Sequence, residues 1–269
     1  MQTALMKYLS LALLLLAAGC SSTGDAPGLR GPVDVVPIFS KANDEAEAGR
    51  YTDARQLFEE VKREDLTGEW APIAQLRIAD TYFEDEPELA IEEYREFLSV
   101  YPRHKYAAYA MYRIAMVHYS QINGPDRGFG PANKAIDAFE SLNAAHPRSP
   151  YRYDALMKIE LAREVLAEHE FLVGDFYFQK GSCEGAVSRL ATLREDYPDF
   201  TRTSGVLYRL ALCYATLHKD DLSAEALSTL RATYPGSDLI ADAEEEVAEI
   251  VEHRDDPPGF FKRLFDSDG

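Results

Sequence analysis

Cys20 is the residue whose type and position most clearly predict a chemical modification of this chain. Two alanines and Gly19 precede it, and before them residues 9–16 are apolar except for one serine. Lys7 gives the stretch a weakly positive start. This order of positive charge, short apolar run and small residues is typical of a secretory signal peptide, which is too short to stay in the bilayer as a spanning helix.

The cysteine directly after Ala-Gly resembles the lipobox of bacterial lipoproteins, where the cysteine becomes the new N-terminus and carries acyl chains. Each buried acyl CH₂ contributes about 0.8 kcal/mol, so more than one chain anchors a protein stably. Ser21 follows the cysteine, as in lipoproteins sent to the outer membrane. We therefore expect a lipoprotein signal peptide at 1–19, a lipid on Cys20 and a flexible tether over 20–37, at the periplasmic face of the outer membrane. An ordinary signal peptide is the alternative.

The remaining candidate catalytic side chains do not form a recognisable catalytic motif. His169-Glu170 begins like a zinc protease motif, but Val173 stands where the second histidine is needed on the same helical face. The six histidines are dispersed without ligand spacing, and the chain contains no G-x-S-x-G sequence. We expect no catalytic residue, no metal site and no cofactor besides the lipid, with a cell-wall enzyme as the alternative from another functional class.

Charge indicates the kind of partner that this chain can bind. The 269 residues include 28 Lys and Arg against 46 Asp and Glu, which gives a net charge of -18. Removing residues 1–19 removes Lys7, so the mature chain is near -19 (-18 minus 1). An acidic surface argues against binding duplex nucleic acid and against docking on anionic lipid. We expect protein partners with basic or apolar faces, and no nucleic acid.

Two cysteines remain after lipidation, Cys183 and Cys213. An oxidising compartment would permit a disulfide between them. Cys213 lies in a helical apolar pattern, where a cysteine is usually a small core residue. The pattern favours free, buried thiols and leaves the bond open.

Internal repetition predicts the fold. Residues 76–82 recur as 112–118 and 208–214, with a weaker copy at 157–160, and an aromatic residue or histidine followed by proline closes four of the units. The pattern resembles the tetratricopeptide repeat, an all-α solenoid, here expected over 38–254. The five expected helix pairs are 38–65, 69–102, 105–147, 151–198 and 201–235, and a C-terminal capping helix should run from Leu239 to about His253. Ala79, Ala115 and Ala211 should lie where paired helices approach closely.

Three segments depart from a plain repeat array. A turn-rich insertion, residues 123–131, separates the helices of repeat three, and the first helix of repeat four is overlong, from Tyr151 to about Gln179, interrupted only by Gly174. The C-terminal tail, 255–269, carries an apolar cluster with two cations at 260–265. This cluster could dock on a partner, on a membrane surface or on the chain's own repeats.

In tetratricopeptide arrays the first helices line a concave groove, and here aromatic residues recur along that face at helical spacing. The expected groove residues are Ile73, Leu76, Asp80, Phe83, Tyr109, Tyr112, Arg113, Met116 and Tyr119. An aromatic-lined groove suits an extended peptide with an aromatic side chain. The alternative is that this stripe is core between helices, which we expect for about half of it.

Cations occupy equivalent positions of four repeats, at Arg77, Arg113, Lys158 and Arg209. Beside the groove they could hold a peptide carboxylate, although pairing with neighbouring acids is slightly favoured. Arginines are also frequent interface anchors, which suggests a partner interface in the second helix of repeat four. The candidates are Arg189 and Arg194, and the alternative is that they pair with Glu184 and Asp196.

Residues 149–198 carry a more specific resemblance. The segments that carry it are Ser149-Pro150-Tyr151, Asp154-Ala155, Leu166-Ala167, Glu170, Val173-Gly174-Asp175-Phe176-Tyr177 and Tyr197-Pro198. Together with the insertion near Asp126-Arg127, they resemble the tetratricopeptide lipoproteins of the outer-membrane β-barrel assembly machinery, the BamD family. Gly174 and Phe176 replace the small and tyrosyl residues expected there, and the tail has no counterpart.

The resemblance implies a scaffold that binds the barrel insertase BamA through its C-terminal repeats, and other assembly lipoproteins as further partners. It also implies that the N-terminal repeats receive signal strands of unfolded outer-membrane proteins, and that no reaction is catalysed. The repeat architecture alone supports only protein binding. A pilotin that escorts a secretin is the alternative scaffold, but the regular repeats usual in pilotins need neither the insertion nor the long helix.

Overall fold

The computed structural model describes residues 33–125, 127 and 129–255. In this part of the chain the secondary structure is helical, without strands. The helices are α2 (Val36–Glu47), α3 (Tyr51–Glu64), α4 (Ala71–Asp85), α5 (Pro87–Val100), α6 (Ala107–Ser120), α7 (Phe129–Ala145), α8 (Arg152–Gln179), α9 (Cys183–Asp196), α10 (Thr203–Thr216), α11 (Asp220–Thr233) and α12 (Leu239–His253). The predicted signal peptide, Cys20 and residues 256–269 lie outside the described residues, and α2 begins two residues before the expected start of the repeats at Ile38.

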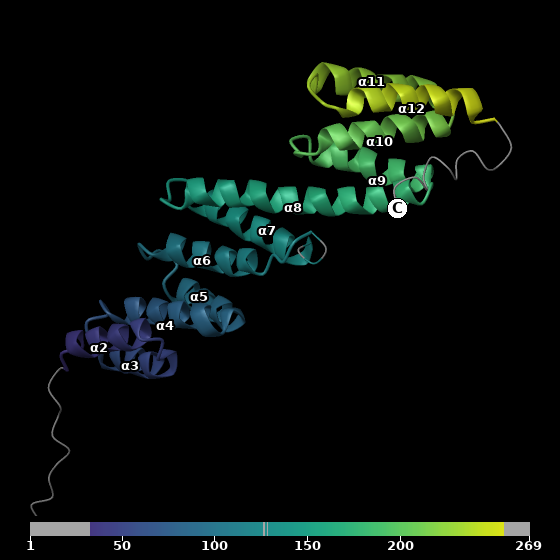
Figure 1. Cartoon of the computed structure of the whole chain (residues 1–269). Helices are drawn as coiled ribbons and strands as arrows, with labels where there is room; N and C mark the ends of the chain where they lie inside the picture. The colour runs from purple at the N-terminus through teal and green to yellow at the C-terminus, as the bar shows by residue number, and fades with distance from the viewer. Residues whose placement is uncertain (1–32, 126, 128, 256–269) are drawn as a thin grey trace, which may run out of the picture.

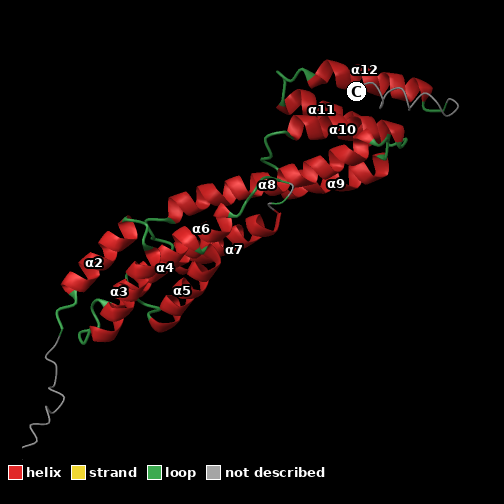
Figure 2. Ribbon diagram, turned by 60° about the horizontal axis from the view of Figure 1, so that its bottom comes forward, coloured by secondary structure: helices red, strands yellow, loops and turns green. Residues whose placement is uncertain are grey.

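Consecutive helices pack in pairs, α2 with α3, α4 with α5, α6 with α7, α8 with α9 and α10 with α11. The pairs stack side by side in an elongated array, with α2 and α12 at opposite ends (Figure 1). The turned view shows the same order (Figure 2). Helix α12 packs mainly against α10 and also contacts α11. The predicted tetratricopeptide solenoid of five helix pairs with a capping helix is confirmed.

Proline sets the end of the second helix in repeats two to five. Helices α5, α9 and α11 each end before a Tyr-Pro pair, and the tyrosines Tyr101, Tyr197 and Tyr234 share a backbone conformation with φ of -124°, -130° and -126°. The residue before a proline is disfavoured in the helical region, so the chain must leave the helix there. The shared geometry points the chain into the next repeat in the same way each time.

The core is a series of clusters along the array instead of a single centre. Large buried side chains such as Phe58, Phe97 and Phe139 fill successive clusters, and each repeat packs on its neighbours. The alanines predicted at close helix contacts, Ala79, Ala115 and Ala211, are fully buried. Ala107, which lies outside the repeated pattern, is buried as well. It therefore cannot serve as an exposed control position for a larger side chain.

The two irregular segments contact each other. The Nδ1 atom of His169 in α8 hydrogen-bonds the carbonyl oxygen of Pro125 in the insertion (3.0 Å), and the ring of Phe129 lies 5.5 Å from that histidine. Helix α7 begins at Phe129, so the insertion ends three residues earlier than predicted. Gly174 does not interrupt α8. A Cβ there would lie 2.5 Å from Leu190, so glycine lets α8 and α9 approach closely.

Helix α8 has 28 residues, enough to span a bilayer by length. Within the part of the chain that the structure describes, however, neither α8 nor any other helix combines that length with the apolar composition that crossing requires.

Candidate binding surfaces

Asp80 on α4 joins three helices on the face formed by the first helices of repeats two and three. Its carboxylate accepts hydrogen bonds from the hydroxyls of Tyr94 on α5 (2.5 Å) and Tyr109 on α6 (2.6 Å). A guanidinium nitrogen of Arg77 lies 3.2 Å from its other oxygen. Burial, and then the charge of Asp80, raise the pKa of both tyrosines above the ordinary value. The hydroxyls therefore stay protonated and act as donors.

Arg113 on α6 lies beside this network. Its guanidinium stacks 3.8 Å from the ring centroid of Phe83 and lies 3.9 Å from Glu84 and 4.0 Å from Asp80. Its Nε atom is buried and has no hydrogen-bond partner among the described residues. The arginine is thus held by charge and stacking while one donor remains free.

A cavity of about 350 Å³ opens beside these residues, between α4, α6 and the α2–α3 pair. Its lining residues are Ala46, Glu47, Tyr51, Arg77, Asp80, Thr81, Glu84, Tyr109 and Arg113. The lining is mainly polar and carries both signs of charge. It could accept a polar group of a peptide more readily than an aromatic side chain.

Farther along the same face, tyrosines join repeat three to repeat four. The ring of Tyr112 stacks on Tyr151 with centroids 4.6 Å apart, and its hydroxyl donates to Asp154 (2.7 Å). The ammonium of Lys158 lies 4.7 Å from the ring centroid of Tyr119. These side chains fill the junction between α6 and α8 instead of lining an open surface.

The predicted groove is therefore only partly correct. Leu76 is buried in the core with Ala79 and Ala90, so its assignment to the groove is wrong. Phe83 and Tyr109 pack against that same core cluster. Three further members of the predicted groove pack against the core cluster between repeats three and four. Those members are Tyr112, Met116 and Tyr119. Ile73 is partly exposed on α4. Core packing, the alternative expectation, describes most of this stripe.

The cations at equivalent positions pair with neighbouring acids, as was slightly favoured. Besides Arg77 and Arg113, Lys158 lies 3.8 Å from Asp154, and Arg209 pairs with Asp175 and also donates to the carbonyl of Gly205 (3.1 Å). Each acid lies on the same helix or on the first helix of the preceding repeat. None of these cations is left without a carboxylate.

Arg189 and Arg194 lie on α9 and are partly exposed, but their acidic partners differ from those expected. Arg189 contacts Glu170 on α8 (3.3 Å), and Arg194 lies 4.0 Å from Glu225 on α11. The expected pairs with Glu184 and Asp196 are not formed, because the helix face of each arginine turns toward a neighbouring helix. Their role at a partner interface stays a prediction.

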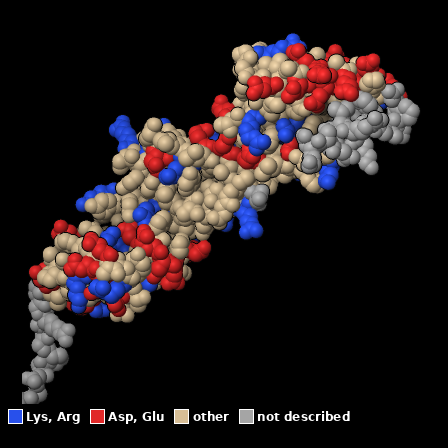
Figure 3. All heavy atoms as spheres, viewed as in Figure 1, with Lys and Arg blue, Asp and Glu red and all other residues tan. Residues whose placement is uncertain are grey.

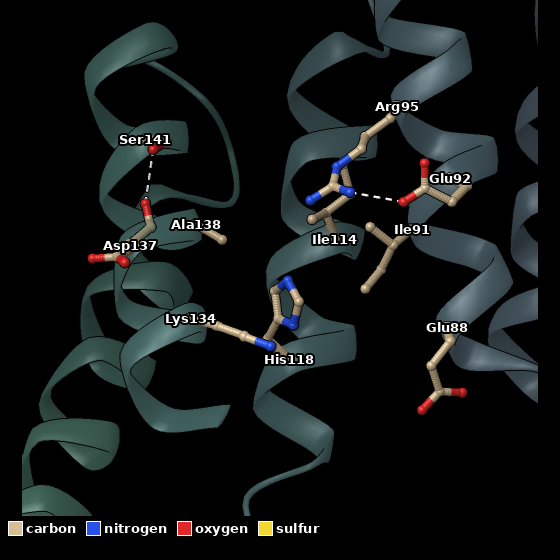
Figure 4. Close-up of a pocket in the computed structure, with 10 residues that line it drawn as sticks. All are labelled: Glu88, Ile91, Glu92, Arg95, Ile114, His118, Lys134, Asp137, Ala138 and Ser141. Carbon is tan, nitrogen blue, oxygen red and sulfur yellow. Dashed lines mark hydrogen bonds and ion pairs between the residues drawn. The ribbon is translucent and has the colours of Figure 1, made fainter. Parts of the chain in front are cut away.

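A second cavity, of about 480 Å³, lies among α5, α6 and α7 (Figure 4). Ile91 and Ile114 contribute apolar surface, and Lys134 and His118 reach toward each other from α7 and α6. Burial, and then the charge of Lys134, lower the pKa of His118. Acids and bases both line the opening, at Glu88, Glu92 and Asp137 and at Arg95 and Lys134, so the cavity shows no strong preference for one sign of charge.

Helix α8 also carries an exposed apolar face that was not predicted from the sequence. Tyr153, Met157, Leu161 and Phe176 are all exposed, although Ala155 and other residues of the opposite face are buried. The first three recur every fourth residue, which in a long helix with a buried opposite face indicates a second apolar stripe. That spacing was the available signal.

The chain is similar to known proteins over most of its length. A family model described as "Outer membrane lipoprotein" (YfiO) matches residues 33–230, most of the chain. The chain belongs to this family. The resemblance to BamD proteins predicted from residues 149–198 is thereby confirmed.

Individual relatives of this chain agree. The "Outer membrane protein assembly factor BamD" of Caulobacter vibrioides is 26% identical over 84% of this chain and 75% of the relative. The protein of the same name from Rickettsia prowazekii is 26% identical over 87% of this chain and 93% of the relative. Among solved structures, the "TPR2AB-domain:pHSP90-complex of yeast Sti1" covers 86% of this chain and 94% of that chain, with 16% identity and a TM-score of 0.45.

The two cysteines of the repeats, Cys183 and Cys213, are free and buried in one core cluster. Among the described residues, the histidines, cysteines and acids form no group of three or more that could hold a metal ion.

Proposed function

We propose that this protein is an outer membrane protein assembly factor of the BamD type, anchored at the periplasmic face of the outer membrane by a lipid on Cys20. The observation that carries the proposal is that relatives matched over 84% and 87% of the chain bear that name. The repeat array supports it, because stacked helix pairs present extended surfaces for protein partners and can serve separate partners at distant ends.

In this proposal the N-terminal repeats receive signal strands of unfolded outer-membrane proteins. The support is the polar cavity beside Arg113, whose buried Nε has no hydrogen-bond partner among the described residues. Nε itself is shielded, but the Arg113 side chain is 21% exposed, so a peptide carbonyl or carboxylate in the cavity would contact the rest of the guanidinium. A small shift of the side chain would also give Nε an acceptor and remove the cost of a buried donor without one. The peptide's aromatic side chains would then lie along the partly exposed rings of Phe83 and Tyr109.

The C-terminal repeats would bind the barrel insertase BamA. Arg194 is partly exposed at the junction of repeats four and five, and its only described ion-pair partner lies at 4.0 Å. Such a loosely held arginine can exchange its partner at an interface at little cost.

Co-purification from detergent-solubilised membranes tests the function. We expect BamA to be retained by the lipidated full-length chain and to be reduced at least fivefold by Arg194→Glu. Arg95→Glu, an exposed arginine on α5, is the matched control. Retention of a secretin in place of BamA would contradict the assignment and support a pilotin.

Peptide binding tests the role of the N-terminal repeats. Arg113→Lys keeps the charge but removes the Nε donor, so it should weaken binding of a peptide from the last strand of an outer-membrane barrel about tenfold. Arg95→Lys should leave the dissociation constant unchanged. Equal affinity of the wild type and Arg113→Lys would remove the cavity from client binding.

A further inference from the structure

A third cavity, of about 540 Å³, lies where the first half of α8 meets the loop between α9 and α10. Its apolar lining residues are Met157, Leu161, Ala167, Tyr197, Pro198 and Phe200. Phe200 and Ala167 are buried and form the floor, whereas Met157 and Leu161 are 48% and 53% exposed. The cavity thus has the build of a socket, with a fixed apolar floor and an apolar wall that faces solvent.

The exposed wall continues along α8. Tyr153, 76% exposed, lies one turn before Met157, and Leu156 beside them is also exposed. Isolated exposed apolar residues are ordinary, but a row along one helix that opens into a cavity marks an interaction site. No other helix in the described part of the chain carries as many exposed large apolar residues as α8.

Acidic side chains surround the opening. Glu160 is paired with Arg163, 3.7 Å away, and that arginine also contacts Glu140. The other three acids of the lining, Glu164, Asp196 and Asp199, have no ion pair within the described ranges. Glu164 accepts a hydrogen bond from the backbone nitrogen of Thr201 (3.3 Å). Figure 3 shows acidic atoms gathered along α8.

We propose that this cavity, the α8 socket, receives an apolar side chain of a partner protein from a segment whose neighbouring residues are basic. The apolar floor and wall would hold the side chain, and the unpaired carboxylates would attract the flanking Lys or Arg residues. The proposal deepens the proposed function, since it assigns the chemistry of a partner to the C-terminal half of the scaffold.

Two other occupants are outcomes that the test must distinguish from a partner protein. An anionic membrane surface would be repelled by the carboxylates around the opening. The chain's own tail starts after Asp255, which contacts His218 beyond the end of α10, whereas Thr201 of the socket lies before its beginning. The 14 residues of α10 separate these points by about 21 Å along the helix axis. A chain of 14 residues is long enough to cover this distance when extended, so the identity of the captured peptide decides between the tail and a partner.

Photo-crosslinking in cells tests the proposal on the lipidated full-length chain. The photoreactive p-benzoylphenylalanine replaces Met157, and mass spectrometry identifies the crosslinked peptide. We expect a peptide of another protein with an aromatic or aliphatic residue within a few positions of two or more Lys or Arg residues. The same probe in place of Leu172, on α8 but outside the socket, is the control and should not capture this peptide.

Two substitutions separate the apolar and the charged contributions. Leu161→Asp should reduce the yield of this crosslink at least tenfold, and Glu164→Lys about threefold, while Leu172→Asp leaves it unchanged. Leu161 and Glu164 are both accessible to solvent, so circular dichroism should show an intact fold.

A crosslink to an acidic segment, to lipid, to the chain's own tail or to nothing would overturn the proposal. So would equal losses for Leu161→Asp and Leu172→Asp. Any partner with the stated chemistry supports it, whether or not that partner is BamA. Failure here is therefore distinguishable from failure of the co-purification test.

Discussion

The faces of α6 and α8 carry similar aromatic and aliphatic side chains but use them differently. On α6, Tyr109 and Tyr112 donate hydrogen bonds to carboxylates of other helices and pack against core clusters. On α8, Tyr153, Met157 and Leu161 stand in solvent beside carboxylates that have no cation partner in the described part of the chain. The α6 side chains contact neighbouring repeats, whereas the α8 side chains are available to a partner.

This difference arises from the lengths of the helices. Helix α6 has 14 residues and is covered on both sides by neighbouring repeats, so its side chains meet protein in nearly every direction. Helix α8 has 28 residues, twice as many, and no single pair of neighbours covers that length. Its first half packs on α7 and its second half on α9, which leaves part of each half exposed.

The largest effect should come from Asp80→Ala, which removes the acceptor that joins three helices. The fully buried Tyr94 would lose its hydrogen-bond partner and Arg77 its nearest carboxylate, at a cost of about 3 kcal/mol in the free energy of unfolding. Chemical denaturation measures it. Glu84→Ala, which removes an exposed carboxylate beside Arg113, should cost less than about 0.5 kcal/mol. Similar costs for the two variants would show that Asp80 does not hold this face together.

Ala115→Leu should follow, because Ala115 is fully buried between paired helices and extra methylene groups would overpack them. The expected cost is about 2 kcal/mol. Ala144→Leu, at an exposed position of α7, is the matched control and should change the unfolding free energy by less than about 0.5 kcal/mol. If both variants melt at the same temperature, the helices around Ala115 are less tightly packed than described.

Tyr112→Phe should have a smaller effect, about 1 kcal/mol, since it removes one hydrogen bond to Asp154 and keeps the stacked ring. Tyr119→Phe is the comparison, because the described residues provide no hydrogen bond to its hydroxyl. Thermal unfolding of the pair isolates the contribution of that bond. Identical stabilities would mean that the hydrogen bond to Asp154 does not stabilise the junction of repeats three and four.

Leu161→Ala should have the smallest effect on stability, less than about 0.5 kcal/mol, because the side chain is already exposed. Leu166→Ala, five residues along the same helix and buried, should cost about 3 kcal/mol. Urea denaturation of both variants checks the contrast. A large cost for Leu161→Ala would mean that the α8 face packs within the chain and is not open to a partner.

The sequence was sufficient to predict the fold because the repeated alanines and the Tyr-Pro pairs act locally, within one helix pair. The binding surfaces were harder to predict. Whether Tyr112 lines a groove or packs between repeats depends on how far α8 lies from α6, which no local pattern specifies. Arg189 likewise forms an ion pair with Glu170 on another helix instead of with an acid near it in the sequence. The α8 face had a readable spacing, but its exposure depends on where α7 and α9 leave the long helix uncovered.

The most direct test of this contrast measures stability and partner binding on the same two variants, Asp80→Ala and Leu161→Asp. We predict that Asp80→Ala lowers the melting temperature by about 6 °C or more. Leu161→Asp should leave the melting temperature within about 2 °C of the wild type, while the crosslink from position 157 to a partner is lost. A Leu161→Asp variant that melts as early as Asp80→Ala and still crosslinks its partner would contradict the account.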